Sequence, residues 1–507
     1  MGTVEHLQAV RAPRRKTAVA TLQAEQLAQG RHAGLDPEAA AYDGRQPMND
    51  APYEVLIIGG GQAGIPLAHA LAGEGWRVAL AERQHLGGSC VNFGCTPTKA
   101  VLASARVAHQ ARRAAEYGIG VGQVEVDFAA VLARARRIAA ESRAGLEARL
   151  QESENPRWLR GHARLEGRSG DGFQVRVGEE MITATQVVLN TGTRSVIPDT
   201  KGLADVDPLH AGNWLHRDEL PAQLVLLGGG YIGAEMSQFY RRMGSRVTLV
   251  ERGGQIADHE DADIAQALQD VLTGEGVEVR LNTEVRRVER NGAGVRLILE
   301  QGGQETALDA THLFVATGRK PNTDDLGLET VGAKVSDHGV VEVDARLASS
   351  VPGLWAAGDI RGGPMFTHTS WDDHRVLLSQ LTGDRTRTTE GRIVPYGMFT
   401  DPQLGRVGMT EREAREAGYE VQVARYEVSK NGKATEIGET QGVVKLVVEA
   451  GSGHILGAAV LAAEGAETVH SYIDLMNAEA PVAVLRDALH IHPTLAEAVQ
   501  SVTRLLE

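Results

Sequence analysis

One sequence pattern occurs twice in this 507-residue chain and restricts its possible folds more than any other feature. In each copy, an apolar run is followed by Gly-x-Gly-x-x-Gly, a helical stretch and a second apolar run ending in glutamate. The first glycine precedes the glutamate by the same distance in both copies (59 to 82 and 228 to 251). The matched residues are Gly59, Gly61, Gly64 and Glu82 in the first copy, and Gly228, Gly230, Gly233 and Glu251 in the second.

The residue types in this pattern suit a dinucleotide. Glycine permits the tight turn, lets the backbone approach a pyrophosphate, and allows the helix to pack closely on the strand. The N-terminus of the helix then faces the phosphates, and the acid accepts hydrogen bonds from a ribose. We therefore expect two nucleotide-binding units, one at each copy.

Both cysteines of the chain, Cys90 and Cys95, lie in the glycine-rich stretch 87–99, directly after the first unit. Pro97 suits the first turn of a helix, and apolar periodicity predicts a helix over about Lys99–Ala115. We expect the cysteines in a loop leading into this helix, with Cys95 at or just before its N-terminus. There the helix dipole lowers the pKa of a thiol.

The cysteine pair has several interpretations. Two reduced cysteines can lie close together by chance, and a structural disulfide is disfavoured without a secretory signal. A zinc site wants four ligands, and only His85 lies nearby. The remaining interpretation is a redox-active pair, for which the two nucleotide-binding units would supply the electrons.

Composition excludes some classes of function. A formal net charge of −14 argues against non-specific nucleic-acid binding, which needs a basic surface. No apolar run reaches the roughly 18 residues of a membrane-spanning helix, so we expect no membrane association. Two cysteines in so long a chain are typical of a reducing compartment, and we expect a cytoplasmic protein.

Other segments predict further elements. A long amphipathic helix is expected over 127–152 and short strands over 157–189. Asp359 follows a strand and could bind a ligand hydroxyl. The run 369–373 (Thr-Ser-Trp-Asp-Asp) predicts a helix N-terminus with a hydroxyl cap. His368 and His374 flank it at a poor spacing for a ligand pair, so we expect no metal site.

Together these landmarks resemble the flavoprotein disulfide reductases, a family that includes dihydrolipoyl dehydrogenase, glutathione reductase and mercuric reductase. The shared motifs are the two glycine patterns, Gly-Gly-Ser-Cys-Val-Asn-x-Gly-Cys-x-Pro-x-Lys, Ala-Gly-Asp near 358, and a terminal His-Pro-Thr-x-x-Glu. The resemblance implies an α/β fold with two Rossmann-like dinucleotide-binding domains and a C-terminal α+β dimerisation domain. It also implies FAD on the first unit, NAD(P)H on the second, and a homodimer with shared active sites.

The resemblance implies the domain boundaries as well. Residues 1–50 are expected to be a flexible extension without readable function, and translation from Met48 is one explanation for it. The FAD-binding domain is expected in two parts. The expected domains are 51–195 and 321–390 for FAD, 196–320 for NAD(P)H, and 391–507 for dimerisation.

Carried over by position, the resemblance assigns roles to individual residues. Cys95 would face the flavin, and Cys90 would exchange with substrate. Lys99 would lie near flavin N5 and pair with Glu235. The acid/base would be His492, oriented by Glu497 and arriving from the other subunit. The further residues that bind FAD would be Thr191, Gly192, Gly358 and Asp359, and Gly318 would bind NAD(P)H. Asp359 would hold the ribityl chain of the flavin.

The substrate is only partly indicated. The sequence of the cysteine stretch most resembles that of mercuric reductases. Those enzymes carry a C-terminal cysteine pair and lack the terminal His-Pro. This chain has the His-Pro and ends Thr-Arg-Leu-Leu-Glu. A disulfide or thiophilic metal ion is therefore expected. Dihydrolipoyl dehydrogenase is an alternative, although Thr96, Thr98 and the segment 366–374 look unlike it. A non-catalytic redox-sensing flavoprotein is another.

The nicotinamide coenzyme is also only partly readable. Glu251 would bind the adenosine ribose hydroxyls and repel a 2′-phosphate, which favours NADH over NADPH. Arg252 beside it could accommodate the phosphate of NADPH.

Overall fold

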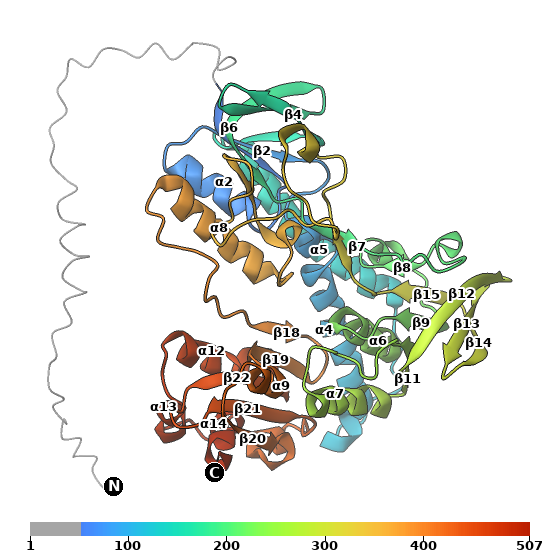
Figure 1. Ribbon diagram of the computed structural model, residues 1–507. Coiled ribbons are helices and arrows are strands. Elements are labelled where there is room, and N and C mark those ends of the chain that lie inside the picture. Colours follow the sequence, from blue (N-terminus) through green and yellow to red (C-terminus); the bar gives the residue numbers. More distant parts are fainter. Residues whose placement is uncertain (1–51, 507) are drawn as a thin grey trace, which may run out of the picture. The chain divides into compact units, whose positions relative to one another are not determined.

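The computed structural model describes residues 52–506, which belong to one of the two units into which the chain divides. The expectations for residues 1–50, including the start at Met48, lie outside the described residues. One seven-stranded and two five-stranded sheets, with helices beside them, make up most of the described part (Figure 1). This arrangement confirms the mixed α/β fold class.

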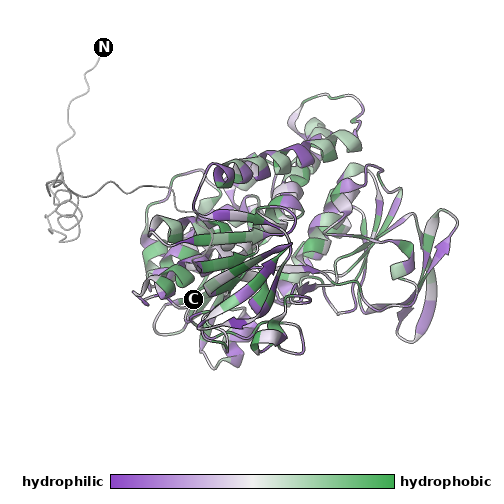
Figure 2. Ribbon diagram, turned by 90° about the horizontal axis from the view of Figure 1, so that it is seen from above, coloured by the Kyte–Doolittle hydropathy of each residue, from purple (hydrophilic) through white to green (hydrophobic). Residues whose placement is uncertain are grey.

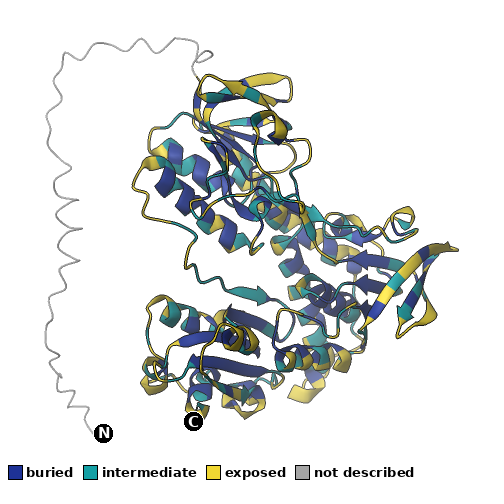
Figure 3. Ribbon diagram, viewed as in Figure 1, coloured by how far each residue is buried: buried dark blue, intermediate teal, exposed yellow. Residues whose placement is uncertain are grey.

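The seven-stranded sheet joins two distant parts of the sequence in the order β3-β2-β1-β6-β5-β4, with β17 also paired to β6. Its strands are β1 (Tyr53–Ile58), β2 (Val78–Glu82), β3 (Arg157–Arg160), β4 (Ala163–Ser169), β5 (Gly172–Val177), β6 (Glu180–Leu189) and β17 (Leu354–Ala356). β1, β2, β3, β6 and β17 are parallel, whereas β4 and β5 are antiparallel to their neighbours. The last four residues of β1 are buried, as in a strand covered on both faces (Figure 3).

Helices of this region come from both parts of the sequence. They are α2 (Gly64–Gly73), α3 (Gly88–Asn92), α4 (Cys95–Arg113), α5 (Phe128–Gln151) and α8 (Thr367–Thr382), with the short 3₁₀ turns η1 (Ala114–Tyr117) and η5 (Gly358–Arg361). α2 packs against α8, although the two are far apart in sequence (Figure 1). The expected long helix is α5, and the side chain of Asp127 caps it by accepting from Ala130 N.

The segment that carries the cysteines differs from the expected loop. Cys90 lies in the short helix α3, and α4 begins at Cys95 rather than near Lys99. Gly87 and Gly88 have φ values of 90° and 61°, which let the chain turn sharply into α3. The side-chain amide of Asn92 then donates to two backbone carbonyls of the segment and stabilises this helix. These local hydrogen bonds were not readable from apolar periodicity.

The second glycine pattern lies in a separate five-stranded parallel sheet of order β11-β10-β9-β15-β8. Its strands are β8 (Leu209–His210), β9 (Gln223–Leu227), β10 (Arg246–Val250), β11 (Val277–Arg280) and β15 (His312–Val315), with the helices α6 (Tyr231–Met243) and α7 (Ala262–Gly274). An antiparallel sheet adjoins it, formed by β12 (Thr283–Asn291), β13 (Gly294–Gln301) and β14 (Gln304–Ala310). Two short strands, β7 (Thr193–Ser195) and β16 (Arg319–Pro321), pair where the chain enters and leaves this region.

The C-terminal region has its own antiparallel sheet in the order β18-β19-β22-β21-β20. Its strands are β18 (Tyr396–Met398), β19 (Gln403–Gly408), β20 (Val421–Glu427), β21 (Val443–Glu449) and β22 (Ile455–Ala462). All eight residues of β22 are buried. Hydrophobic residues line much of the length of many strands and helices of the described part (Figure 2). The helices are α9 (Glu411–Glu416), α10 (Gly432–Glu436), α11 (Gly465–Thr468), α12 (His470–Asn477), α13 (Ala483–Asp487) and α14 (Ala496–Ser501).

The start of α8 corrects a second expectation. The helix begins at Thr367, two residues before the expected hydroxyl cap, and its N-cap residue Phe366 makes no side-chain cap hydrogen bond. Asp373, expected in the first turn, lies deeper in the helix and is fully buried. It accepts from Gly358 N and pairs with Arg361 and Arg392. Tertiary ion pairs therefore explain this acid better than helix capping does.

Among residues 52–506, no helix is long and apolar enough to cross a membrane.

Candidate active site

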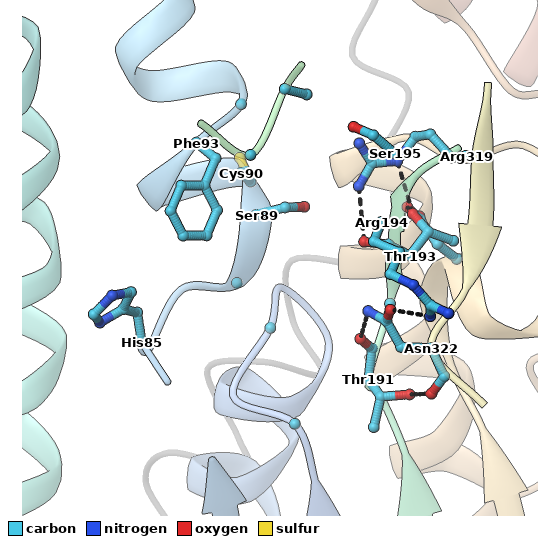
Figure 4. A pocket seen from close by; sticks show the side chains of 18 of the residues that line it. His85, Ser89, Cys90, Phe93, Thr191, Thr193, Arg194, Ser195, Arg319 and Asn322 are labelled. Atoms are coloured by element: carbon cyan, nitrogen blue, oxygen red, sulfur yellow. Dashed lines mark hydrogen bonds between the residues drawn. The ribbon is translucent and has the colours of Figure 1, made fainter. Parts of the chain in front are cut away.

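A cavity of about 640 Å³ contains both cysteines and much of the first glycine pattern. The residues that were expected at the site and that line this cavity are Gly59, Gly61, Glu82, Cys90, Cys95, Lys99, Thr191, Gly192, Glu235 and Asp359. In Figure 4 the cysteine segment, with Ser89, Cys90 and Phe93, lies opposite a wall formed by Thr191, Thr193 and Asn322. Residues from five separate stretches of sequence thus converge on one space of ligand size.

Cys90 and Cys95 are free thiols that interact with each other. Hydrogen bonding to Cys90 lowers the pKa of Cys95 to about 6, opposed by burial and assisted by Thr367 and Lys99. Hydrogen bonding to Cys95, together with burial, raises the pKa of Cys90. Cys95 is also the first residue of α4, where the helix dipole favours an anion. At neutral pH these shifts favour a thiolate on Cys95 and a thiol on Cys90.

Lys99 and Glu235 form an ion pair beside the thiols. Lys99 Nζ lies 2.9 and 3.1 Å from the two carboxylate oxygens of Glu235. The same carboxylate accepts from Phe399 N at 2.9 Å, and the Lys99 ammonium lies 4.4 Å from the centre of the Phe399 ring. The structure thus brings together the pair that the resemblance implied. Phe399 was missed, because no sequence motif marks it.

The two glycine patterns hold their acids in the same way. Glu82 accepts from Gly60 N at 2.9 Å and from Gln84 N at 2.7 Å. Glu251 accepts from Gly229 N and Gly253 N, both at 2.6 Å. Each acid therefore also braces its own glycine turn, a role that the sequence analysis did not include.

The wall opposite the cysteines is a network of side chains from both halves of the first domain. Thr193 Oγ1 donates to Asp359 at 2.8 Å and accepts from Arg319 Nε at 2.7 Å. The Asn322 amide donates to Thr191 O at 2.8 Å and accepts from Arg194 at 2.9 Å (Figure 4). Of these residues, only Thr191 and Asp359 were expected to have a role. Thr193, Arg194 and Arg319 are brought together by the pairing of β7 with β16, which no sequence motif marks.

The glycines test whether dinucleotides fit. At Gly61 a Cβ would lie 2.8 Å from Asn190 Oδ1, so packing within the chain already requires glycine there. At Gly230 a Cβ would meet no atom within 4 Å, and φ is −70°, so neither packing nor backbone strain requires glycine. Close approach of a ligand does explain it. Gly192 and Gly318 also have open space beside them, but their φ values of 65° and 134° already favour glycine. The residues of the second unit therefore fit a dinucleotide at Gly230, and the cavity lined by Gly59, Gly61 and Glu82 gives the first unit room for one.

Comparison with known proteins decides the family. Residues 53–373 match the family described as pyridine nucleotide-disulphide oxidoreductase, and residues 394–503 match its dimerisation domain. The chain belongs to this family. Its members are oxidoreductases that bind FAD and use NAD(P)H.

Several relatives align over almost their whole length. The chain is 33% identical to the probable pyridine nucleotide-disulfide oxidoreductase RclA of Escherichia coli, over 90% of this chain and 99% of that protein. It is 32% identical to a dihydrolipoyl dehydrogenase of Cupriavidus necator (88% of this chain, 96% of that protein) and to a mercuric reductase of Streptomyces lividans (88% and 95%). A Cu(II) complex of E. coli RclA superposes with a TM-score of 0.82 at 32% identity, covering 90% of this chain and all of that one.

Within the dimerisation domain, His492 and Glu497 lie together. His492 Nδ1 is 3.0 Å from Glu497 Oε1, and Glu497 Oε2 accepts from Thr494 N at 2.8 Å. These two hydrogen bonds lower the pKa of Glu497, so its carboxylate stays ionised. The His492 side chain is 76% exposed, and neither residue lines the cavity that holds the thiols of the same subunit.

The histidines near the start of α8 serve other contacts. His368 Nε2 lies 2.6 Å from Pro395 O, and His374 Nδ1 contacts Trp371 O. Among residues 52–506, no cluster of three or more histidine, cysteine or acidic side chains could hold a metal ion. Thr367, directly before His368, was missed, although its Oγ1 lies 3.2 Å from Cys95 Sγ. The contact joins residues 272 positions apart, which sequence spacing cannot reveal.

Proposed function

We propose that this chain is a homodimeric, FAD-dependent reductase that uses NADH to reduce a disulfide, or alternatively a thiophilic metal ion, through Cys90 and Cys95. The observation that carries the proposal is the thiol pair itself, with a thiolate on Cys95, a thiol on Cys90, and a shared cavity beside the first glycine pattern. The thiols also favour a reducing compartment, so we place the protein in the cytoplasm.

FAD, when bound, would accept the hydride of the nicotinamide and deliver an electron pair to the Cys90–Cys95 disulfide. Gly59, Gly61 and Glu82 would hold its phosphates and ribose, and Asp359 its ribityl chain. Lys99, neutralised by Glu235, would place a positive charge beside the Cys95 thiolate. A charge at this place stabilises the anion that the reduced pair must hold.

Cys90 would then react with the substrate. Deprotonated, it attacks one sulfur of the substrate disulfide, the bond between the substrate sulfurs breaks, and the first substrate thiolate leaves. Cys95 attacks the Cys90 sulfur next, which releases the second thiolate and re-forms the Cys90–Cys95 disulfide. Because the pKa of Cys90 is raised, this sequence needs a base to take its proton and an acid to protonate the leaving thiolates.

We propose that the base is His492 of a second subunit. Its orientation by Glu497 gives the arrangement of nucleophile, base and orienting acid that activated thiols use. Its exposure and its distance from the cavity of its own subunit support delivery to a partner, as does the match to a dimerisation domain. A monomer would lack this base.

The proposed coenzyme rests on the charge of Glu251, and the proposed substrates rest on the relatives of the chain. The carboxylate of Glu251 at the end of β10 would repel a 2′-phosphate, which favours NADH. Cu(II) complexes of E. coli RclA, including one of a cysteine-to-serine mutant, make copper a candidate among metal ions. Lipoamide tests the alternative of a dihydrolipoyl dehydrogenase.

The test is NADH consumption by the purified flavoprotein with a panel of acceptors: lipoamide, oxidised glutathione, mycothiol-type and coenzyme A disulfides, Hg(II), Cu(II) and quinones. We expect steady turnover with at least one disulfide or metal ion, and its loss in Cys95→Ser. No turnover on any acceptor would contradict the proposal and favour a redox-sensing flavoprotein.

The role of His492 has its own test. His492→Ala should retain reduction of the bound flavin by NADH and lose disulfide turnover by about 10²- to 10⁴-fold, the usual contribution of an acid/base. His454→Ala, on an exposed loop of the same domain, is the control. Unchanged turnover in His492→Ala would remove this residue from the mechanism.

A further inference from the structure

A buried polar cluster joins the dimerisation domain to the NAD(P)H-binding sheet, away from any residue assigned so far. Its members are Glu260, which precedes α7, Tyr396 of β18 and Arg406 of β19. Glu260 and Arg406 are each 1% exposed. Tyr396 and Arg406 are directly paired across the two antiparallel strands, so their side chains lie on the same face of the sheet.

The contacts within this cluster are specific. The Tyr396 hydroxyl donates to Glu260 Oε1, and Arg406 Nη1 lies 3.9 Å from Glu260 Oε2. Burial raises the pKa of Tyr396, which therefore stays a hydrogen-bond donor. Burial also raises the pKa of Glu260, against the opposing charge of Arg406. Asp261 and Glu413, the other charged groups that face Glu260, raise its pKa as well.

Tyr396 also contacts the start of α8. Its ring stacks on Phe366 with centroids 5.4 Å apart and planes 8° apart, and Phe366 stacks on His368 at 5.4 Å and 6°. The His368 ring in turn contacts Pro395 O, next to Tyr396. These stacked rings pack against the first turn of α8, whose N-terminus has no side-chain cap.

The first residue of that turn touches the redox centre. Thr367 Oγ1 lies 3.2 Å from Cys95 Sγ, and once Cys95 is a thiolate only the hydroxyl can donate. The other titratable groups that face Cys95 are Cys90, Lys99 and Glu235. Tyr231 lies near enough to feel the charge of Cys95. Of the two groups that hydrogen-bond to Cys95, Cys90 and Thr367, only Thr367 does not titrate.

We propose that Glu260, Tyr396 and Arg406 form an anchor that holds the stacked rings and thereby positions the Thr367 hydroxyl against Cys95. Thr367 is then a hydrogen-bond donor to the thiolate, and the three anchor residues are positioning residues that act through it. Any effect of this hydrogen bond on turnover rests on the proposed function. Its effect on the charge state of Cys95 does not.

The experiment measures that charge state directly. In a Cys90→Ser background Cys95 is the only cysteine of the chain, and the serine hydroxyl keeps a donor beside it. The rate of Cys95 alkylation by iodoacetamide is followed from pH 4 to pH 10, with the alkylated protein quantified by mass spectrometry. Because only the thiolate reacts, the midpoint of this profile reports the thiolate equilibrium.

Thr367→Val removes the donor at nearly constant volume. It should raise the midpoint by about one pH unit, or about tenfold in rate below the midpoint, as expected for one lost hydrogen bond to an anion. Thr367→Ser should restore the original midpoint. An unchanged midpoint in Thr367→Val would overturn the assignment of Thr367.

Two variants of Tyr396 then test the anchor. Tyr396→Phe removes the hydroxyl that contacts Glu260 and keeps the stacked ring, whereas Tyr396→Leu removes both. Both variants should raise the midpoint of the alkylation profile, as Thr367→Val does. Tyr396→Leu should raise it more than Tyr396→Phe. If the leucine variant fails to fold, the phenylalanine variant carries the test.

Tyr472→Phe is the matched control. Tyr472 is also a buried tyrosine of the dimerisation domain, and its hydroxyl donates to Val499 O, with no contact to α8. Its variant should leave the midpoint unchanged. If both Tyr396 variants also leave it unchanged, the anchor is overturned even where Thr367→Val shifts the profile. The titration uses neither NADH nor substrate, so failure of the proposed function would not be mistaken for failure of this inference.

Discussion

The two glycine-rich units of this chain show what a repeated pattern preserves and what it leaves free. Both place a glycine of φ near 100° directly after a parallel strand, 109° at Gly59 and 102° at Gly228. Both bind the terminal glutamate through two backbone N–H groups, one of them from the glycine turn. The geometry that receives a phosphate is therefore the same in the two units.

The differences lie where each unit meets the rest of the chain. Gly61 packs against Asn190, whereas its counterpart Gly230 faces open space. Two residues after the last glycine, the first unit has Pro66 and the second has Glu235, which reaches Lys99. The cysteines follow the first unit and have no counterpart after the second. The two copies thus share the glycine turn and its acid, and they differ in the residues that lie beside the thiols.

The largest expected effect concerns the thiols that follow the first unit. With a pKa of about 6, Cys95 should be about 90% thiolate at pH 7, against a few per cent for free cysteine. Because its pKa is lowered, the thiolate is present above pH 6 and is lost as the pH falls through that value. Iodoacetamide alkylation of the reduced protein should follow this profile, with glutathione as the control. A midpoint above pH 8 would contradict it.

The next effect compares the two middle glycines. Gly61→Ala would displace the Asn190 side chain, which binds Gly64 N and Ala357 O, and should lower the free energy of unfolding by about 2–4 kcal/mol. Gly230→Ala should change it by less than about 0.5 kcal/mol and weaken NADH binding instead. Denaturant unfolding and NADH titration measure both. Equal destabilisation by the two variants would break the comparison.

A smaller effect is expected at the position where the helices of the two units diverge. Glu235→Gln keeps the shape of the side chain but leaves the Lys99 ammonium without a charged acceptor. The free energy of unfolding should fall by about 1–3 kcal/mol, towards the lower value because Lys99 is 35% exposed. Glu141→Gln, in an exposed pair with Arg137, is the control and should cost less than about 0.5 kcal/mol. Equal losses of unfolding free energy in the two variants would show that burial of Glu235 does not strengthen its ion pair with Lys99.

The smallest expected effect is a change in coenzyme preference, which should differ between variants of Glu251 and of Glu82. Glu251→Gln removes the charge that would repel a 2′-phosphate, so the ratio of kcat/KM for NADPH to that for NADH should rise about tenfold. Glu82→Gln makes the same change in the first unit and should leave this ratio unaltered. A rise of the ratio in both variants would mean that the units do not bind different nucleotides.

Much of the fold was predictable, because it follows from local sequence. The strands β1, β2, β9 and β10 and the helices α2 and α6 lie where apolar periodicity and glycine placed them, within a few residues. Expectations failed where side-chain hydrogen bonds or tertiary ion pairs, which apolar periodicity does not show, determine the local structure. The cysteine segment became helical through hydrogen bonds of the Asn92 side chain. α8 begins at Thr367 rather than after the expected hydroxyl cap, and Asp373, which was expected in the first turn, forms a buried ion pair with Arg361 instead.

By itself, the sequence determined two nucleotide-binding units, a cysteine pair at a helix start and a terminal His-Glu pair, because each depends on neighbours a few residues apart. Only the tertiary structure decided which groups surround the thiols. Lys99 meets Glu235 across 136 positions and Cys95 meets Thr367 across 272, through the packing of helices that are far apart in the sequence. Such contacts depend on how whole elements pack, and no spacing along the chain encodes them. The pKa values that govern the chemistry depend on those contacts.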